Sequence, residues 1–389
     1  MRITRTPLCR FVTGCLFSLL VGVAGCGSSG GGSNSNPDAG SSGSGGKSGG
    51  GTSGASGGGG GNSGGGTGGS AIGGKITSNG CAGGTCQNPT CQAMGTPAAI
   101  GTSPEIGFET MPTYIPNNMI IPTFDDVPDG ATDATDPTYK VYGAGQYTKQ
   151  ILAFLKTNNM HADFFINSDN WCGPVADDDD CVATLTDILT TQNPANHTVH
   201  HMHMGGTTVF NAMDLGSSSC GFDATAQVKC EDEITGVESL VNMLTLGSIP
   251  HLTRFRAPYG EPYQAGMPNL IPVQQVVSKY AVSVGWQMDS GDSSCDDTLG
   301  VPCFTGMQIY NNVVTMVGTA PGQRWGILLM HGTFPWTKDA VPMLLHPTTG
   351  YFATHGFKLA TVEDVICWKY GKHSWEIIQQ LTGQPHTPN

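Results

Sequence analysis

The sequence predicts an α/β domain built on a mainly parallel sheet. Short apolar runs typical of strands alternate with stretches in which apolar residues recur at helical spacing. Chemically reactive residues directly follow several of these runs, as they do at the carboxyl ends of parallel strands. The chain has 389 residues, and about 315 remain for one sizeable domain once the first 74, which contain no core-forming pattern, are set aside.

The expected elements follow one another in regular alternation. Tyr147, Ile151 and Leu155 lie four residues apart and predict an amphipathic helix, and a second helix covers 234–244 and ends at Gly247. Strands are expected on both sides of these helices and toward the end of the chain, at 119–124, 163–166, 253–256, 281–288, 326–330 and 357–360.

Residues 1–26 have the features of an export signal. A basic start is followed by a mostly apolar stretch, 11–24, that is short for a membrane span. The stretch ends in small residues before Cys26 and resembles the lipobox of bacterial lipoproteins, in which the cysteine receives a lipid. Gly27 stands where an Asp would imply retention in the inner membrane. We therefore expect a lipid anchor in the cell envelope, at the outer membrane or cell surface; the alternative is an ordinary signal peptide.

Residues 27–75 are expected to form a flexible linker. Of the 48 residues from 27 to 74, 24 are Gly and 12 are Ser, and a flexible chain of this length spans roughly 40 Å. The net charge is −13; without the three arginines of residues 1–26 it becomes −16. Such an acidic body argues against nucleic acid as a partner. No apolar run of about 18 residues follows the N-terminal segment, which excludes a protein with several membrane spans.

Ten cysteines remain after those of the signal and Cys26 are set aside. An even number in an exported chain predicts disulfides. The shortest loops favour three pairs, although the spacing leaves the connectivity open: Cys172–Cys181, Cys220–Cys230 and Cys295–Cys303. The segment 76–97 offers an alternative, a zinc knuckle that lacks its fourth ligand, with Cys81, Cys86 and Cys91. An acid run, Asp177–Asp180, is expected to form a solvated loop tip, with a calcium site as the alternative.

Five polar segments of the expected catalytic domain, 98–389, follow predicted strands. They are TFDDVPDG at 123–130, HTVHHMH at 197–203, RFRAPYG at 254–260, GWQMDSGD at 285–292 and LLMHG at 328–332. Asp125 and Asp126 are adjacent, so their side chains leave a strand in different directions and can have different roles. His197 and His201 are four residues apart, a spacing that directs two imidazoles at one metal if the segment is a helical turn. One carboxylate and two imidazoles are typical of catalytic zinc, which keeps a position open for water.

These segments resemble the motifs of polysaccharide deacetylases with the NodB homology domain, carbohydrate esterase family 4, over about residues 118–365. The resemblance implies a distorted (β/α) barrel with fewer than eight strands. It assigns a general base, Asp125, and three ligands of a divalent metal, most often Zn²⁺: Asp126, His197 and His201. By the same resemblance, Arg256 holds the base and the backbone N–H of Tyr259 binds the oxyanion. Leu329 lines the acetyl pocket, and His331 is the general acid. Asp292 is expected to orient His331, with Asp289 as the rival.

The sequence departs from the family pattern at two positions. Val127 follows the Asp pair in place of a Gly, and Ser293 follows Asp292 in place of a Trp that walls the acetyl pocket. We expect these changes to affect the choice of substrate more than the reaction.

The function expected from these residues is deacetylation of an N- or O-acetylated carbohydrate such as a chitin-like polymer, peptidoglycan or xylan. An acetyl-xylan type of O-esterase is the alternative among enzymes. A cell-surface carbohydrate-binding protein of the same fold, impaired in turnover, is the alternative from another class. A surface spacer or adhesion module would explain the linker but not the five motifs.

Overall fold

The computed structural model describes residues 91–109, 112–129, 146–170, 173–175, 178–204, 230–247, 249, 251–263, 270–294, 304–318 and 326–386. They all fall within one compact unit, residues 66–389. The expected signal segment with Cys26, the linker and most of the segment 76–97 lie outside the described residues. No helix in the described ranges is long and apolar enough to cross a membrane.

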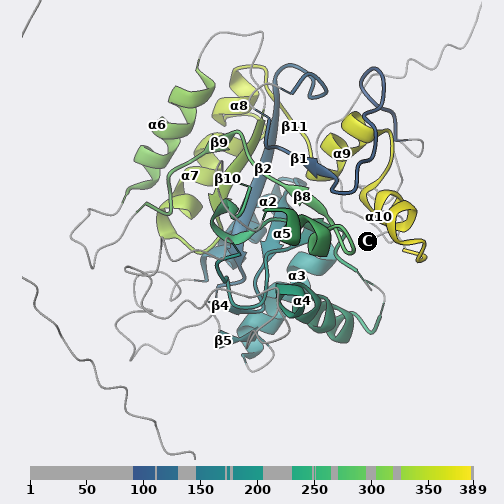
Figure 1. Cartoon of the computed structure of the whole chain (residues 1–389). Coiled ribbons are helices and arrows are strands. Elements are labelled where there is room, and N and C mark those ends of the chain that lie inside the picture. Colours follow the sequence, from purple (N-terminus) through teal and green to yellow (C-terminus); the bar gives the residue numbers. More distant parts are fainter. Residues whose placement is uncertain are drawn as a thin grey trace, which may run out of the picture. The chain divides into compact units, whose positions relative to one another are not determined.

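A parallel sheet forms the centre of this unit (Figure 1). Its strands are β1 (Glu105–Ile106), β2 (Met119–Val127), β3 (Asp163–Ile166), β6 (Asn193–Asn196), β7 (Arg254–Phe255), β8 (Val282–Val284), β9 (Met288–Asp289), β10 (Gly326–His331) and β11 (Lys358–Leu359). Eight lie in the order β1-β8-β7-β6-β3-β2-β10-β9, and β11 pairs with the start of β2. Every pairing in this sheet is parallel. A separate antiparallel pair joins β4 (Asp169–Asn170) and β5 (Gly173–Pro174).

The sheet is curved into an incomplete barrel. β8 and β9 lie near opposite ends of the strand order, yet only residues 285–287 separate them in the chain. The chain from Val284 to Met288 spans at most about 14 Å, so the two sides of the sheet must approach each other. The predicted distorted (β/α) barrel is therefore confirmed. The expected number of strands was too low, because β1 and β6 were not predicted and the single run expected at 281–288 corresponds to two strands, β8 and β9.

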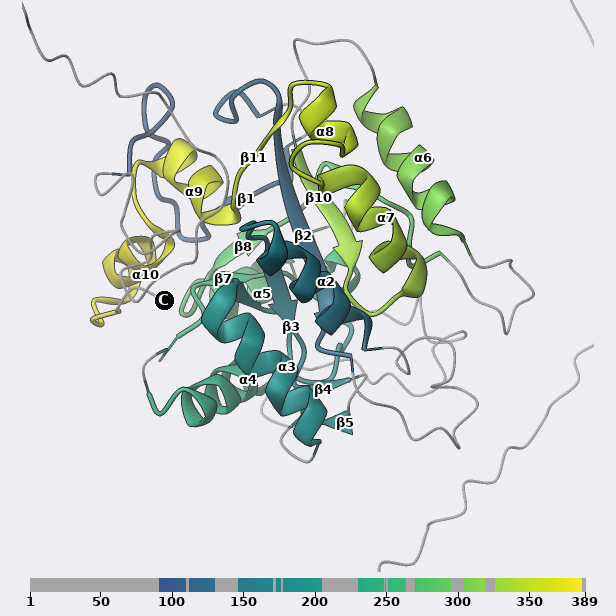
Figure 2. The same ribbon diagram turned by 180° about the vertical axis from the view of Figure 1, so that it is seen from behind.

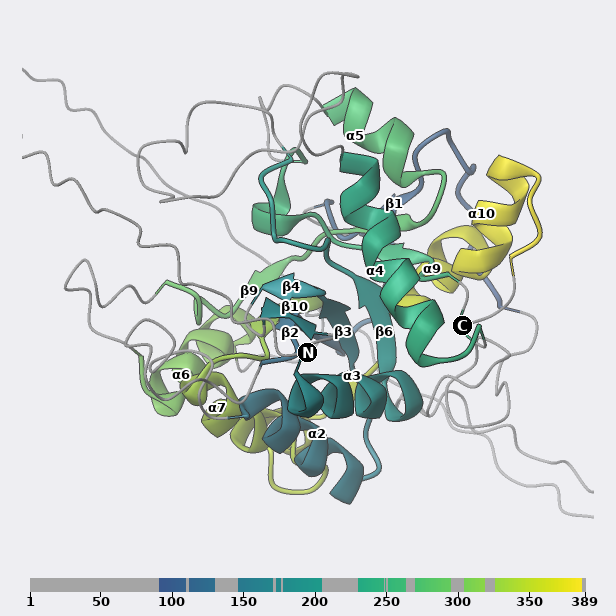
Figure 3. The ribbon, with the colours of Figure 1, turned by 90° about the horizontal axis from the view of Figure 1, so that it is seen from below.

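Helices pack around the outside of this sheet, with α6, α7, α2, α3 and α4 in a row along one side (Figure 3). The view from behind shows α2, α3 and α7 in front of the strands (Figure 2). Their bounds are α2 (Tyr147–Thr157), α3 (Asp179–Thr191), α4 (Cys230–Leu244), α5 (Leu270–Val277), α6 (Gly306–Val317), α7 (Pro335–Leu345), α8 (Tyr351–Thr354), α9 (Val362–Tyr370) and α10 (Ser374–Thr382). The two predicted helices correspond to α2 and α4. In α2 the apolar face is buried through Ile151, Leu152 and Leu155.

The acid run at 177–180 does not form the expected loop tip. Asp178 is the N-cap of α3, and its side chain accepts hydrogen bonds from the backbone N–H groups of Asp180 and Cys181. Asp179 and Asp180 lie in the first turn, where negative charge is favourable because the unpaired N–H groups there carry partial positive charge. Asp177 lies outside the described residues.

One disulfide ties distant segments together. Cys91 is bonded to Cys367 in α9, 276 residues along the chain, which excludes Cys91 as a ligand of the zinc knuckle. Cys181 and Cys230 are also disulfide-bonded. Their expected partners, Cys172 and Cys220, lie outside the described residues, as do Cys295 and Cys303.

We predict that the Cys91–Cys367 bond contributes strongly to stability. Removing a native disulfide from a secreted domain commonly costs about 2–5 kcal/mol, because the unfolded chain gains freedom. Cys367→Ala should lower the free energy of unfolding by this amount in urea titrations. The double variant Cys91→Ala/Cys367→Ala is the control without a free thiol and should show the same loss. An unchanged unfolding midpoint in both variants would contradict the prediction.

Candidate active site

The reactive residues meet at one end of the sheet. Asp125 and Asp126 lie near the end of β2, His197 directly follows β6, Arg256 follows β7, and His331 is the last residue of β10. Because these strands are parallel, their carboxyl ends share one edge, where α/β barrels build their sites. His331 is the register partner of Asp125 on the neighbouring strand.

Asp126, His197 and His201 form a group suited to a metal ion. One ligand atom from each lies within 4.8 Å of the other two. Asp126 Oδ1 is 3.6 Å from His197 Nε2 and 3.2 Å from His201 Nε2. Ligand atoms of a tetrahedral zinc with bonds of about 2.1 Å are about 3.4 Å apart. The three residues thus fit a divalent ion in both donor type and spacing.

The segment that carries the two histidines is a loop and not the helical turn that the spacing suggested. Thr198 and His201 have positive φ angles of 71° and 52°. Asn167 stabilises the bend, since its side-chain amide donates to the carbonyls of His197 and Thr198. The Asn196 side chain accepts from the Thr198 N–H at 2.9 Å. The imidazoles nevertheless converge, with ring centroids 5.1 Å apart.

His197 is held in the protonation state that a metal ligand requires. Its Nδ1–H donates to the carbonyl oxygen of Arg256 at 2.7 Å, so the lone pair is on Nε2, which faces Asp126. Burial lowers the pKa of His197 to about 3. The imidazole therefore stays neutral at physiological pH.

Asp125 is held by Arg256 inside the barrel. The Arg256 Nη1 donates to Asp125 Oδ1 at 2.6 Å and to Thr123 Oγ1 at 2.8 Å. The guanidinium also donates to the carbonyls of Val284 and Gly285, both at 3.2 Å. Burial raises the pKa of Asp125 to about 6, although the charges of Arg256 and His331 oppose the rise. Asp125 is thus a positioned carboxylate whose pKa lies near the working range of a general base.

His331 forms a buried pair with Asp292. Its Nδ1 is 2.7 Å from Asp292 Oδ1, and its backbone N–H donates to Asp292 Oδ2 at 2.8 Å. Burial alone would lower the pKa of His331, but the charge and hydrogen bond of Asp292 outweigh it and raise that pKa to about 10. Asp289, the rival, accepts instead from the N–H of Gly291 at 2.8 Å. The geometry therefore favours Asp292 as the residue that orients His331.

Residues of α7 fix Asp292 in turn. Thr337 Oγ1 donates to Asp292 Oδ2 at 2.5 Å, and Trp336 Nε1 donates to the Asp292 carbonyl at 2.7 Å. Phe334 stacks on Trp336 and lies 5.6 Å from the His331 ring, measured between centroids. These residues were not predicted from the sequence, because no helix was expected at 335–345 and nothing there marks them as contacts of a strand-end carboxylate.

Tyr259 lies at the rim of this group, and Leu329 lies beneath it. The Tyr259 side chain is 39% exposed, and its ring lies edge-on to His201 at 4.5 Å. His203 stacks on the same ring at 4.0 Å, and its Nδ1 is 3.0 Å from Glu261 Oε1. Leu329 is buried in β10, where its register partners are Thr123 and Asp289. The sequence analysis also missed the support that His203 and Glu261 give to Tyr259.

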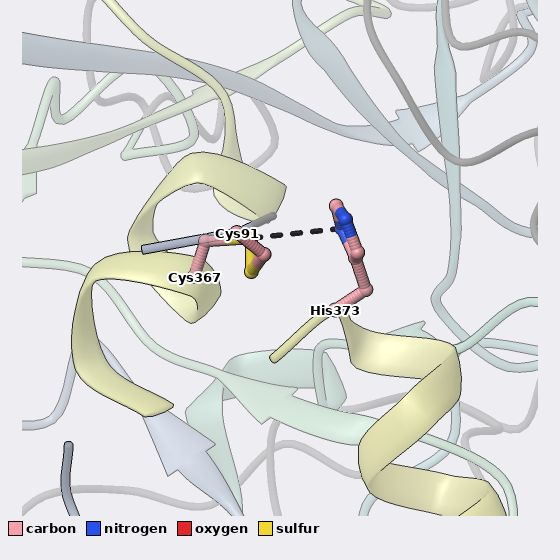
Figure 4. A group of neighbouring side chains, drawn as sticks. All are labelled: Cys91, Cys367 and His373. Atoms are coloured by element: carbon pink, nitrogen blue, oxygen red, sulfur yellow. Dashed lines mark hydrogen bonds between the residues drawn. A yellow bond between two sulfur atoms is a disulfide. The ribbon is translucent and has the colours of Figure 1, made fainter. Parts of the chain in front are cut away.

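A second group with metal-binding residue types lies elsewhere and differs in chemistry (Figure 4). It consists of Cys91, Cys367 and His373, but the two sulfurs are joined in a disulfide. His373 Nδ1 lies 3.5 Å from Cys367 Sγ and 3.2 Å from Glu363 Oε1. Neither sulfur is a thiolate, so this group has no anionic sulfur ligand to offer a metal.

The fold and the site together define an α/β barrel domain with three side chains suited to a divalent metal at the carboxyl ends of its strands. Residues 115–271 match the sequence model of a family described as polysaccharide deacetylase. This segment therefore matches the polysaccharide deacetylase family, as its motifs indicated. No curated protein sequence matches the chain.

Several solved structures resemble the chain at low sequence identity. A chitin deacetylase from Colletotrichum lindemuthianum is 15% identical with a TM-score of 0.41, covering 64% of this chain and 87% of its own. A peptidoglycan deacetylase from Bacillus subtilis is 20% identical with a TM-score of 0.39, covering 68% and 93%. A family 4 carbohydrate esterase from Streptomyces lividans, solved with acetate, is 22% identical with a TM-score of 0.39, covering 63% and 92%. At these values the likenesses carry no assignment of activity or substrate.

We predict that Asp292 controls the titration of His331. Asp292→Asn removes the negative charge that raises the pKa of His331 and leaves the opposing effect of burial. The pKa, about 10 in the parent chain, should fall, so the imidazole loses its proton at a lower pH. Histidine side-chain NMR across the pH range measures this change. Asp289→Asn is the matched control and should leave the titration in place; equal shifts in both variants would refute the assignment.

Proposed function

We propose that this chain is a metal-dependent hydrolase that removes acetyl groups from an N- or O-acetylated carbohydrate. One observation carries the proposal. A carboxylate held by Arg256 and an imidazole held by Asp292 are register partners on adjacent strands, beside a group of three metal-ligating side chains. This combination of base, acid and ligands is what hydrolysis of an acetyl amide or ester without a covalent intermediate requires.

In this proposal Asp126, His197 and His201 hold the ion, and their donor set favours Zn²⁺. A divalent ion bound there would lower the pKa of a water molecule from about 15.7 toward 7 and polarise the acetyl carbonyl. The neutral state of His197, fixed by its bond to the Arg256 carbonyl, supports this role. Only one carboxylate of the adjacent pair is assigned to the ion, because the other is engaged by Arg256.

Asp125 takes the proton of the attacking water, and His331 supplies a proton to the leaving amine or alkoxide. The two roles need opposite protonation states at one pH. Burial places the pKa of Asp125 at about 6, and Asp292 places that of His331 at about 10. Between these values the base is ionised while the acid is protonated. This separation of two pKa values supports the division of roles.

Tyr259 and Leu329 are the proposed contacts of the acetylated sugar. Tyr259 has an exposed ring beside His201 and would offer its backbone N–H to the developing oxyanion. Leu329 would contact the acetyl methyl group. Chitin-like polymers, peptidoglycan and acetylated xylan are the substrates to compare, and acetate release from each, with and without a chelator, is the direct assay.

A carbohydrate-binding protein impaired in turnover is the second candidate, and Ser293 favours it. This residue is exposed and stands where the family resemblance implies a Trp. Binding of the same polymers without any acetate release, in the presence of added Zn²⁺, would support this candidate against the enzyme.

The main prediction separates two neighbouring carboxylates. Asp126→Asn should lose bound zinc and activity together. Asp125→Asn should keep near-parental zinc while acetate release falls by about 10²–10⁴-fold, because only general-base catalysis is lost. His331→Ala should also keep zinc and lose rate, most strongly on amides, since an amine leaves poorly without a proton. Zinc per chain and acetate release are measured on the same samples, with circular dichroism as the control for folding.

Two outcomes would contradict these roles. If Asp125→Asn removes the metal, the carboxylates have been assigned in the wrong order. If Asp125→Asn leaves the rate intact, the base lies elsewhere.

We also propose that the chain is exported and anchored through a lipid on Cys26, with residues 27–75 as the tether. The support is the lipobox-like segment next to a Gly/Ser-rich stretch. Incorporation of labelled fatty acid should be abolished in Cys26→Ser and retained in Cys15→Ser. Labelling that persists in Cys26→Ser would refute the anchor.

A further inference from the structure

A cavity of about 720 Å³ lies at the opposite end of the sheet from the candidate active site. Its walls come from segments that precede strands: Thr102 before β1, His251 before β7, and residues 278–280 before β8. Residues 381–386, at the end of α10 and beyond it, complete the cavity; the C-terminus is marked in Figure 1. These strands are parallel, so their amino ends face away from the edge that carries Asp125.

Two imidazoles form one wall of this cavity. The rings of His251 and His386 have centroids 4.6 Å apart and are tilted by 37°. His386 Nδ1–H donates to the carbonyl of Gln384 at 2.9 Å, and His251 Nδ1 faces Glu238 Oε2 at 3.5 Å. The two nitrogens of an imidazole point in different directions, so each Nε2 is oriented away from these contacts. The wall therefore contributes two imidazole rings with hydrogen-bonding nitrogens to the lining.

The positive groups of the lining are already compensated. Lys279 Nζ is 3.0 Å from Glu231 Oε1, and the Tyr280 hydroxyl donates to the same oxygen at 2.7 Å. His251 faces Glu238. With each of these cations next to a carboxylate, and a chain of net charge −13, an anionic ligand would find little uncompensated positive charge. The electrostatics favour a neutral ligand.

The other lining residues favour a ligand that is both polar and apolar. Leu381 and Pro385 present apolar surface, while Thr102 and Ser278 bring hydroxyl groups. The volume lies within the range of about 300–1,000 Å³ typical of small-molecule sites. A neutral sugar combines apolar C–H faces with hydroxyl edges, and so matches rings, apolar side chains and hydroxyls arranged around one cavity.

We propose that this cavity binds a neutral saccharide unit, as a second carbohydrate site at the amino ends of β1, β7 and β8. The ligand class follows from the lining. That the saccharide belongs to a polymer that is also the substrate rests on the proposed function. A polymer held there and at the active site gains affinity from the higher effective concentration of the second contact. The cavity would thus hold long or insoluble chains without contributing to the chemical step.

Direct binding tests the proposal independently of catalysis. Chitohexaose and xylohexaose are titrated into the full chain while histidine side-chain NMR follows His251 and His386. Both signals should shift saturably, and equally in an Asp125→Asn background. Ser278 is half-buried in the cavity wall, and Ser278→Trp places a bulky side chain there. The affinity for the hexasaccharide, measured from the shifts, should fall at least about tenfold. Gln380→Trp, on the exposed surface of α10 and outside the cavity, is the matched control and should bind as the parent does.

The outcomes separate this site from the proposed function. Saturable shifts that Ser278→Trp removes support the cavity even if no acetate is ever released. Absence of shifts at millimolar hexasaccharide, or shifts that survive Ser278→Trp, would overturn it, whatever the activity. A response to glucuronate oligomers with none to neutral sugars would overturn the neutral ligand class. In an active enzyme, Ser278→Trp should slow acetate release from insoluble polymer severalfold while a soluble short substrate reacts at the parental rate.

Discussion

The buried ion pair between Arg256 and Asp125 is the interaction on which the site depends. Both side chains are almost completely buried, and a charge in such an interior is tolerated only when it is paired and hydrogen-bonded. Arg256 satisfies this condition by donating to β2 through Asp125 and Thr123, and to the end of β8 through two carbonyls. Its own carbonyl accepts from His197. One residue therefore positions the proposed base and a proposed metal ligand, and links β2 to the end of β8.

This pairing also explains how two adjacent carboxylates acquire different surroundings. In a regular strand, Asp125 and Asp126 would point to opposite faces. Here the register with β3 shifts between Phe124 and Val127, and Asp126 has a positive φ of 63°. Asp125 stays with Arg256 inside the barrel, while Asp126 turns toward the loop that carries His197 and His201. The strained backbone at a strand end thus gives the proposed base and the proposed ligand different surroundings.

The sequence predicted the parts of the fold whose signal is local. Alternating apolar runs located β2, β3 and β10, and the apolar face of α2 was visible from three residues. β6 was missed because its sequence, Asn-Pro-Ala-Asn, has low strand propensity and is a strand only through pairing with β3 and β7. The Cys91–Cys367 bond was also out of reach, since 276 residues separate its ends and short loops gave the only guide to pairing.

The candidate site was more predictable than its geometry. The motif residues were identified because strand ends are where reactive side chains gather, and the structure brings them to one edge. His197 and His201 do not lie on a helical turn, because the bend depends on Asn167, which follows another strand and hydrogen-bonds to the loop. Spacing along the chain therefore indicated the candidate ligands, while a contact between distant segments determines how they converge.

The two departures from the family pattern can be understood in the same way. Val127 packs against Gly332, the residue that follows His331 at the end of the neighbouring strand. A Cβ added at Gly332 would collide with the Val127 side chain. The glycine that the resemblance expects after the Asp pair is therefore found across from Val127 instead. Ser293 is exposed, yet an indole still contacts Asp292, because Trp336 of α7 donates to its carbonyl. The charged residues of the site come from strand ends, whereas the indole beside Asp292 comes from a helix that packs nearby. A motif search therefore detects the charged residues, and only the structure reveals that Trp336 hydrogen-bonds to Asp292.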